Sequence, residues 1–139
     1  MKRTELLRRV LADCFCQLQP SPIHGIGVFA MRDIPKRTNP FKTLTKYATV
    51  GSVRVTDEEL AVLPPKLAAL IRALFVPTKA GRMYVPTCGL NVIYLDTYIN
   101  HSSKPNLRTK DGVRFITNRR IHEGEELTVD YRTYEACIN

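Results

Sequence analysis

The hydrophobic positions are most regular in the middle of the chain, where they repeat at the spacing of an α-helix. Apolar side chains three or four residues apart share one face of that helix: Leu67, Leu70, Ile71, Leu74 and Phe75. Thr56 and Glu59 have the spacing of a capping box, in which each side chain bonds a free backbone N–H of the first turn. Pro64-Pro65 interrupts the segment, because proline lacks the amide donor that a helix interior needs. The pattern predicts two helices within 57–75, the second beginning at Pro65.

Shorter hydrophobic stretches between turn residues occupy the rest of the chain and are typical of β-strands. Residues 1–12 are an exception and predict a short amphipathic helix or a frayed start. Asp111-Gly112 has the composition of a hairpin turn. The predicted strands are 15–18, the run after Gly25-Ile26-Gly27, one or two within 41–55, and 83–85, 92–95, 113–117 and 127–131. Many short strands with one helical insertion, and no alternation of strand and helix, predict an α+β fold that is mostly β.

Length and composition fit one ordinary globular domain. The chain has 139 residues, of which 44% are hydrophobic and 24% charged, which argues against a disordered tail, a collagen-like fibre or a coiled coil. The longest uncharged run, 83–95, is shorter than the roughly 20 residues that cross a bilayer. The N-terminus shows no apolar segment or cleavage pattern of a secretory signal. We therefore expect an intracellular protein with no membrane partner.

Charge is unevenly distributed along the chain, whose net charge is +8. An excess of this size favours nucleic acid or another polyanion, although a solvated basic surface is the simpler interpretation. A basic run contains Arg32, Lys36, Arg37, Lys42, Lys46 and Arg54. An acidic cluster contains Glu123, Glu125, Glu126 and Asp130. The acidic cluster is suited to a cationic ligand despite the net positive charge.

The cysteines do not have the spacing of a zinc finger. None of Cys14, Cys16, Cys88 and Cys137 belongs to a C-x-x-C pair, so we expect reduced, mostly buried thiols and no metal. The less favoured alternative is a metal held by Cys14 and Cys16, since a C-x-C on a strand places both sulfurs on one face.

Polar residues concentrate in three segments far apart in the chain. The first reads S-P-x-x-G-x-G-x-F-A from Ser21, the second N-H-S-x-x-P-N from Asn100, and the third G-E-E-L-T-x-D-Y from Gly124 to Tyr131. The first lacks the third glycine of a dinucleotide-binding loop. Taken singly, the segments are a turn, a loop that caps its own backbone and a strand with a half-buried tyrosine.

Taken together, in this order, the three segments resemble the SET domain of protein lysine methyltransferases. The resemblance covers roughly residues 15–135 and is closest to the small stand-alone SET proteins of bacteria and large DNA viruses. It implies one domain over 1–139, built from several small β-sheets around a knot-like core, with the helical insertion at about 57–76. It also implies transfer of methyl groups from S-adenosylmethionine to a lysine side chain of a histone or another basic protein.

The resemblance implies a role for each residue of a cofactor site. The backbone of His24, Gly25, Ile26 and Gly27 would line the methionine part of S-adenosylmethionine. Asn100 would bond its amino-acid end, and His101 would meet the adenine, mainly through its backbone. Tyr131 would be the catalytic tyrosine beside the transferring methyl group, and would also contact the cofactor.

A lysine channel is also implied, with four candidate lining residues: Tyr134, Val129, Tyr47 and Tyr98. Many family members have Phe or Tyr in place of Val129, which limits the number of methyl groups added. A small Val favours di- or trimethylation.

The chain departs from many members at Ser103, where they have a Cys that joins a C-terminal zinc-binding extension. Only Cys137 follows it here, so we expect neither zinc nor that extension. The channel would then be covered by the last residues, the middle helices or a second subunit, which makes a homodimer one alternative.

Two rival functions stay open. One is a catalytically inactive SET-like binding module, and the other is a basic nucleic-acid-binding domain. A combination is also consistent, in which an enzyme docks on nucleic acid or chromatin through its basic surface. The location would be cytoplasmic in a bacterium and nuclear or chromatin-bound in a eukaryotic or virus-infected cell.

Overall fold

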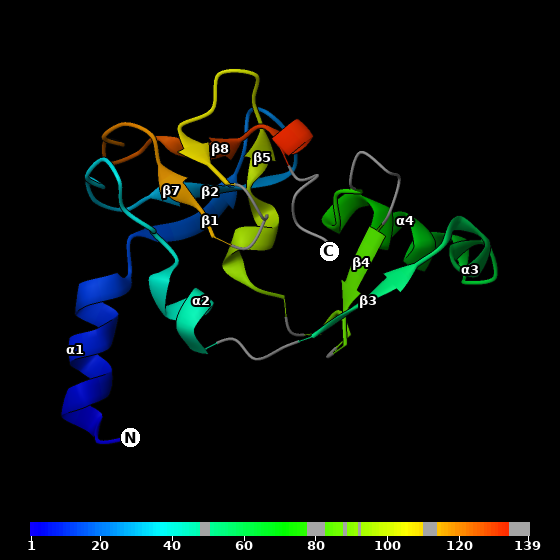
Figure 1. Ribbon diagram of the computed structural model, residues 1–139, viewed down its shortest axis with the longest axis horizontal. Coiled ribbons are helices and arrows are strands. Elements are labelled where there is room, and N and C mark those ends of the chain that lie inside the picture. The colour runs from blue at the N-terminus through cyan, green and yellow to red at the C-terminus, as the bar shows by residue number, and fades with distance from the viewer. Residues whose placement is uncertain (48–50, 78–82, 88, 92, 110–113, 134–139) are drawn as a thin grey trace.

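The computed structural model describes residues 1–47, 51–77, 83–87, 89–91, 93–109 and 114–133, apart from the side chains at 45–47. Its main sheet has four strands in the order β1 (Cys16–Pro20), β2 (Ile26–Ala30), β8 (Glu126–Val129) and β5 (Asn100–His101). The first three strands run antiparallel, whereas β5 lies parallel to β8 (Figure 1). This parallel pair places Asn100 opposite Thr128, and so brings the second and third polar segments together.

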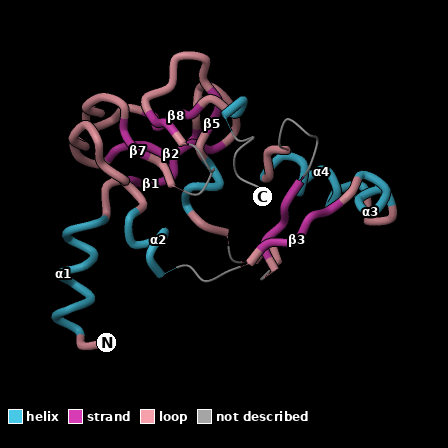
Figure 2. Tube along the Cα trace, viewed as in Figure 1, coloured by secondary structure: helices cyan, strands magenta, loops and turns pink. Residues whose placement is uncertain are grey.

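Two smaller sheets accompany the main one. The pair β3 (Ser52–Val55) and β4 (Met83–Pro86) flanks the helical insertion, and β6 (Leu107–Arg108) pairs with β7 (Ile116–Thr117). The helices are α1 (Arg3–Asp13), α2 (Lys42–Tyr47), α3 (Asp57–Ala61), α4 (Pro65–Leu74) and the short 3₁₀ helix η1 (Leu95–Tyr98). Figure 2 shows how little of the fold is helical around the main sheet. The predicted α+β fold, mostly β with a helical insertion, is confirmed.

A tight turn joins β1 to β2 and explains the first glycine of the G-x-G segment. The Ser21 amide donates to the Gly25 carbonyl at 2.8 Å, and the Ser21 hydroxyl accepts from the Ile23 amide at 3.0 Å. Gly25 has a φ of 46°, in the left-handed region where a side chain is strained. The chain therefore enters β2 through a tight turn in which Gly25 carries no side chain.

Two hydrophobic clusters hold the elements in place. The larger lies under the main sheet and includes the fully buried Val28, Ile34, Leu107 and Leu127. The smaller joins the helical insertion to β4 through buried side chains: Leu60, Ala68, Ile71 and Met83.

The buried side chain of Asn106 supports the beginning of β8. Its Nδ2 donates to the Glu126 carbonyl at 2.8 Å, and its Oδ1 accepts from the Thr128 amide at 2.8 Å. An asparagine amide carries both a donor and an acceptor, as a backbone peptide does. Asn106 thus takes the place of a short partner strand, and it fixes the strand that leads to Tyr131.

The secondary-structure predictions are confirmed where the residues that determine them lie within one element. The capping box of Thr56 and Glu59 is present, and the helical segment divides into α3 and α4 as its prolines predict. The helix predicted at the N-terminus is α1. The predicted hairpin turn at Asp111-Gly112 lies outside the described residues.

Of the one or two strands predicted within 41–55, one is present as β3 (Ser52–Val55), whereas the beginning of that range and the strand predicted at 92–95 are not strands in their described parts. Residues 42–47, predicted within a strand, form α2, because Phe41 and Leu44 stand three apart and both pack against the main core. Residues 93–94 are not in a strand, and the segment continues into η1, whose Leu95 and Tyr98 pack in the same way. A stretch this short holds too few apolar positions for the sequence alone to distinguish a helical period from alternation.

Candidate functional site

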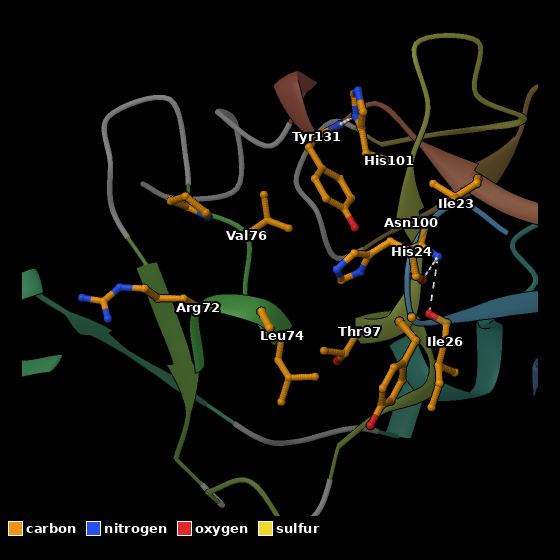
Figure 3. A pocket seen from close by; sticks show the side chains of 14 residues that line it. Ile23, His24, Ile26, Arg72, Leu74, Val76, Thr97, Asn100, His101 and Tyr131 are labelled. Carbon is orange, nitrogen blue, oxygen red and sulfur yellow. Dashed lines mark hydrogen bonds between the residues drawn. The ribbon is translucent and has the colours of Figure 1, made fainter. Parts of the chain in front are cut away.

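A pocket of about 620 Å³ opens beside the main sheet. This volume is within the range of roughly 300–1,000 Å³ usual for small-molecule sites. One wall comes from the turn before β2, from β5 and from Tyr131, and the facing wall comes from the end of α4 and the residues after it (Figure 3). Thr97 and Tyr98 of η1 complete the lining. The pocket therefore draws on segments from four distant parts of the chain.

Asn100 connects the walls of this pocket through its side-chain nitrogen. The buried Nδ2 donates to the His24 carbonyl at 2.9 Å, the Ile26 carbonyl at 3.4 Å and Glu126 Oε1 at 3.2 Å. All three partners are acceptors, so the amide nitrogen must face them. No described residue donates to the Asn100 Oδ1, which leaves that oxygen available to an N–H donor in the pocket.

Gly27 lies behind the pocket wall rather than in its lining. A Cβ at this position would meet the Glu126 carboxylate directly and would lie 3.1 Å from the Ser21 Cβ. A side chain at position 27 would therefore have to displace the Glu126 carboxylate, whereas at Gly25 the backbone angle favours glycine.

Tyr131 follows β8 and directs its phenol into the pocket (Figure 3). The hydroxyl donates to the Ile99 carbonyl at 2.5 Å. Burial raises the pKa of Tyr131 above its ordinary value, and the negative charge of Glu126 raises it further. The phenol therefore stays protonated at neutral pH, where it acts as a hydrogen-bond donor rather than as a base.

His101 is held against Tyr131 by a backbone contact. Its Nδ1 accepts from the Tyr131 amide at 3.1 Å, and the two rings have centroids 5.3 Å apart. Because Nδ1 accepts a hydrogen bond, it carries no proton, and its 3.8 Å contact with Asp130 is not an ion pair. Asp130 instead pairs with Arg132, whose side-chain hydrogen bond is the main reason that the pKa of Asp130 falls to about 2.

The predicted cofactor residues His24, Gly25, Ile26, Asn100, His101 and Tyr131 all line the one pocket. Among the predicted channel residues, Tyr98 also lines it. Val129 does not: it is fully buried in the main core, on the same face of β8 as Leu127. Its place beside a lysine channel stays a prediction, as do those of Tyr134 and Tyr47, because Tyr134 and the Tyr47 side chain lie outside the described residues.

The middle helices were one of three predicted covers for the channel, but the individual residues of the facing wall were not predicted from the sequence. Arg72, Leu74 and Val76 line the pocket, and the Arg72 guanidinium lies 3.6 Å from Asp57. The helical pattern predicts a buried face for Leu74 but not what that face meets. Contacts between an insertion and a distant loop depend on the tertiary fold, for which the local pattern holds no signal.

The acidic cluster of the sequence is divided in the structure. Glu125 pairs with Arg119 at 3.0 Å, which lowers the pKa of Glu125 mainly through the side-chain hydrogen bond, and Asp130 pairs with Arg132. Two members of the cluster reach residues that line the pocket: Glu126 bonds Asn100, and the Asp130 carboxylate lies 3.8 Å from the His101 Nδ1.

The basic run is likewise not one free surface. The Arg32 guanidinium lies 4.1 Å from the Phe15 ring centroid and donates to the Ala12 carbonyl at 3.0 Å. At least this basic residue therefore has a structural role that connects α1 to the main body of the chain.

Within the described residues, no group of three or more His, Cys, Asp or Glu side chains is arranged to hold a metal. Cys14 ends α1 and is exposed, whereas Cys16 begins β1 and is buried, so the two do not form a C-x-C on a single strand. Burial raises the pKa of Cys16 to about 12 and keeps its thiol protonated. Cys88 and Cys137 lie outside the described residues.

No helix in the described part of the chain has the length and apolarity needed to cross a bilayer.

Asp96, in η1 just below the pocket, gives a prediction for the pH dependence of stability. Burial raises the pKa of Asp96 to about 6. Between the ordinary pKa of about 4 and this value the folded state binds more protons than the unfolded state, so stability falls as pH rises through that window and then levels off. Asp96→Asn should remove this slope and stabilise the protein by about 1–3 kcal/mol at pH 7. Urea unfolding at several pH values measures the effect. The control Glu58→Gln, at an exposed helix position, should keep the slope, and an unchanged slope in Asp96→Asn would contradict the assignment.

Known proteins give two findings. No curated protein matches the chain. A crystal structure of a Plasmodium falciparum protein, provisionally described as a histone methyltransferase, is similar over 84% of this chain and 91% of that chain, with 18% identity and a TM-score of 0.47.

A family model gives the decisive match. The model of the SET domain matches residues 25–132, a range that begins at Gly25 and includes Asn100, His101 and Tyr131. The match covers well over half of the chain, and so the chain belongs to the SET-domain family.

Proposed function

We propose that this protein is a protein-lysine N-methyltransferase that uses S-adenosylmethionine and acts on a histone or another basic protein. SET-domain proteins are generally methyltransferases that use this cofactor. We further propose that residues 1–139 form a single SET domain. The observation that carries the proposal is the convergence of Asn100, His101, Tyr131 and the turn at 24–26, with Gly25 at its centre, on one pocket.

The chemistry of these groups fits the cofactor. The Asn100 Oδ1, which no described residue engages, is an acceptor for the ammonium of the cofactor's amino-acid end. At Gly25, no heavy atom beyond its chain neighbours lies within 4 Å of the place that a Cβ would occupy, so a ligand can approach the backbone of this turn closely. When bound, S-adenosylmethionine supplies an electrophilic methyl group attached to a sulfonium.

The protein's own residues position the reactants rather than transfer a proton. An ammonium has no lone pair, so the target lysine must be neutral, and a partly dry site beside a positive charge lowers its pKa. Tyr131 is unsuited to remove that proton, because its raised pKa keeps the phenol protonated. The Tyr131 hydroxyl, held by the Ile99 carbonyl, serves instead as a fixed polar group in the wall. Alignment of this kind is a large source of rate acceleration when two reactants are held at close range.

The direct test is to incubate the purified protein with methyl-labelled S-adenosylmethionine and a mixture of histones and ribosomal proteins. We expect the label on lysine side chains, located by mass spectrometry of the labelled protein. A substrate in which the labelled lysine is replaced by arginine should accept no label. Cofactor binding without transfer to any protein would instead favour an inactive binding module.

A further inference from the structure

Glu126 is the acidic residue whose position the established features leave unexplained. It begins β8, and its Oε1 accepts from the Asn100 Nδ2 at 3.2 Å. Its Oε2 is buried, and no described residue donates to it. The carboxylate also fills the space beside Gly27 where a Cβ would otherwise fit. It therefore lies directly behind the wall formed by Asn100 and the 24–27 backbone.

The charge on Glu126 is not balanced within the described part of the chain. Its neighbours in the acidic cluster differ, because Glu125 pairs with Arg119 and Asp130 pairs with Arg132. Enclosing a carboxylate without a cation is costly, since protein surroundings solvate a charge less well than water does. A positively charged ligand in the adjoining pocket would supply the missing partner.

The negative charge of the Glu126 carboxylate acts electrostatically on a residue that lines the pocket. The charge of Glu126 contributes to the raised pKa of Tyr131, whose phenol lies in the lining. Arg72, the opposing cation, extends its guanidinium away from Tyr131 and Asn100 in Figure 3, and Asp57 lies 3.6 Å from it. The negative charge thus acts on the Asn100 side of the cavity.

We propose that the Glu126 carboxylate makes this pocket prefer a cationic methyl donor over the neutral product that remains after transfer. The inference rests on the proposed function. S-adenosylmethionine carries a positive sulfonium, and when the sulfur–methyl bond breaks and the methyl group bonds to the amine nitrogen, the sulfur becomes a neutral thioether. A fixed negative charge behind Asn100 attracts the sulfonium of the first and is indifferent to the thioether sulfur of the second. The two ligands carry the same amino-acid end, so its attraction does not distinguish them. The charge on Glu126 would thereby assist exchange of product for fresh donor.

The test compares the affinities of the two ligands by calorimetry, in the full chain with Glu126→Gln and with the matched control Glu125→Gln. Glutamine keeps the shape of Glu126 and can still accept from Asn100, so the variant removes mainly charge. Both ligands carry the ammonium that Asn100 would meet, so the variant should weaken both, and we expect the loss of S-adenosylmethionine affinity to exceed the loss of S-adenosylhomocysteine affinity by about three-fold or more. Glu125→Gln should leave both affinities within about two-fold, because its partner Arg119 lies outside the pocket.

The ratio of the two affinities is the decisive quantity, because partial misfolding weakens both ligands by the same factor and cancels in the ratio. Glu126→Asp, which keeps the charge, should keep the wild-type ratio. If Glu126→Gln weakened the binding of both ligands equally, Glu126 would have only a structural role, and the inference would be overturned. Wild-type affinity for both ligands in Glu126→Gln would overturn it as well. Failure of the unaltered protein to bind either ligand would overturn the proposed function itself.

Discussion

Replacing Tyr131 with phenylalanine should lower kcat by about 100-fold or more and leave cofactor affinity within about three-fold. The hydroxyl is the polar end of a phenol in the pocket lining, it is held by the Ile99 carbonyl at 2.5 Å, and it stays protonated at neutral pH. Removing it takes away a fixed polar group at the site where the reactants are held, while the ring continues to pack against His101. Single-turnover methylation of a mapped substrate lysine gives the rate, and calorimetry gives the affinity.

Tyr98 offers a matched control for that experiment. It lines the same pocket, but no described residue bonds its hydroxyl, so Tyr98→Phe should retain most of the turnover. A Tyr131→Phe protein that loses affinity and turnover equally would mean that the hydroxyl helps to hold the cofactor rather than to orient the reactants. Full turnover in Tyr131→Phe would remove the assigned role altogether.

Gly27→Ala should cause the second large effect, this time on stability and cofactor affinity together. The added methyl group would meet the Glu126 carboxylate and approach the Ser21 Cβ, so either Glu126 or the backbone of β2 must move. Overpacking of this kind costs about 1–3 kcal/mol. Displacement of Glu126 would also release the Asn100 amide that it orients, and we expect cofactor affinity to fall about ten-fold or more.

Alanine substitutions at two other glycines serve as controls for Gly27→Ala. At Gly51 the nearest atom to an added Cβ is 3.8 Å away, so Gly51→Ala should change neither the thermal midpoint nor the affinity. At Gly25 nothing lies within 4 Å, but the φ of 46° makes alanine strained, so Gly25→Ala should cost about 1 kcal/mol through the backbone alone. Wild-type stability and affinity in Gly27→Ala would show that the carboxylate can leave its position freely.

Sequence reasoning succeeded where the determining contacts are local or where three segments together carry a family resemblance. The capping box of Thr56 and Glu59 and the break at Pro64-Pro65 involve neighbours along one helix, so their pattern determines the result. Segments too short to show a period were misjudged, as α2 illustrates: its residues make fewer than about two helical turns, so the spacing of Phe41 and Leu44 gives no clear helical repeat.

Some residues of the pocket could be predicted from the sequence and others could not, for the same reason. The resemblance led to a shared site for Asn100 and Tyr131, which the parallel pairing of β5 with β8 brings together. It gave no role to Asn106, and the sequence placed Glu126 only within an acidic cluster suited to a cationic ligand, without separating it from its neighbours. Only the fold separates Glu126, which points to Asn100, from Glu125, which pairs with Arg119 at the surface. The wall provided by α4 depends on contacts across the whole chain, and no short pattern encodes them.

The hydrogen bonds of Asn106 limit how an extended peptide can approach this protein. Strand β5 is two residues long and pairs only with Thr128 and Val129, so the Glu126 carbonyl would otherwise be free to receive an added strand. The Asn106 amide already occupies that carbonyl and the Thr128 amide. A substrate segment therefore cannot dock by β-augmentation at the start of β8, and must find its backbone partners on another part of the molecule.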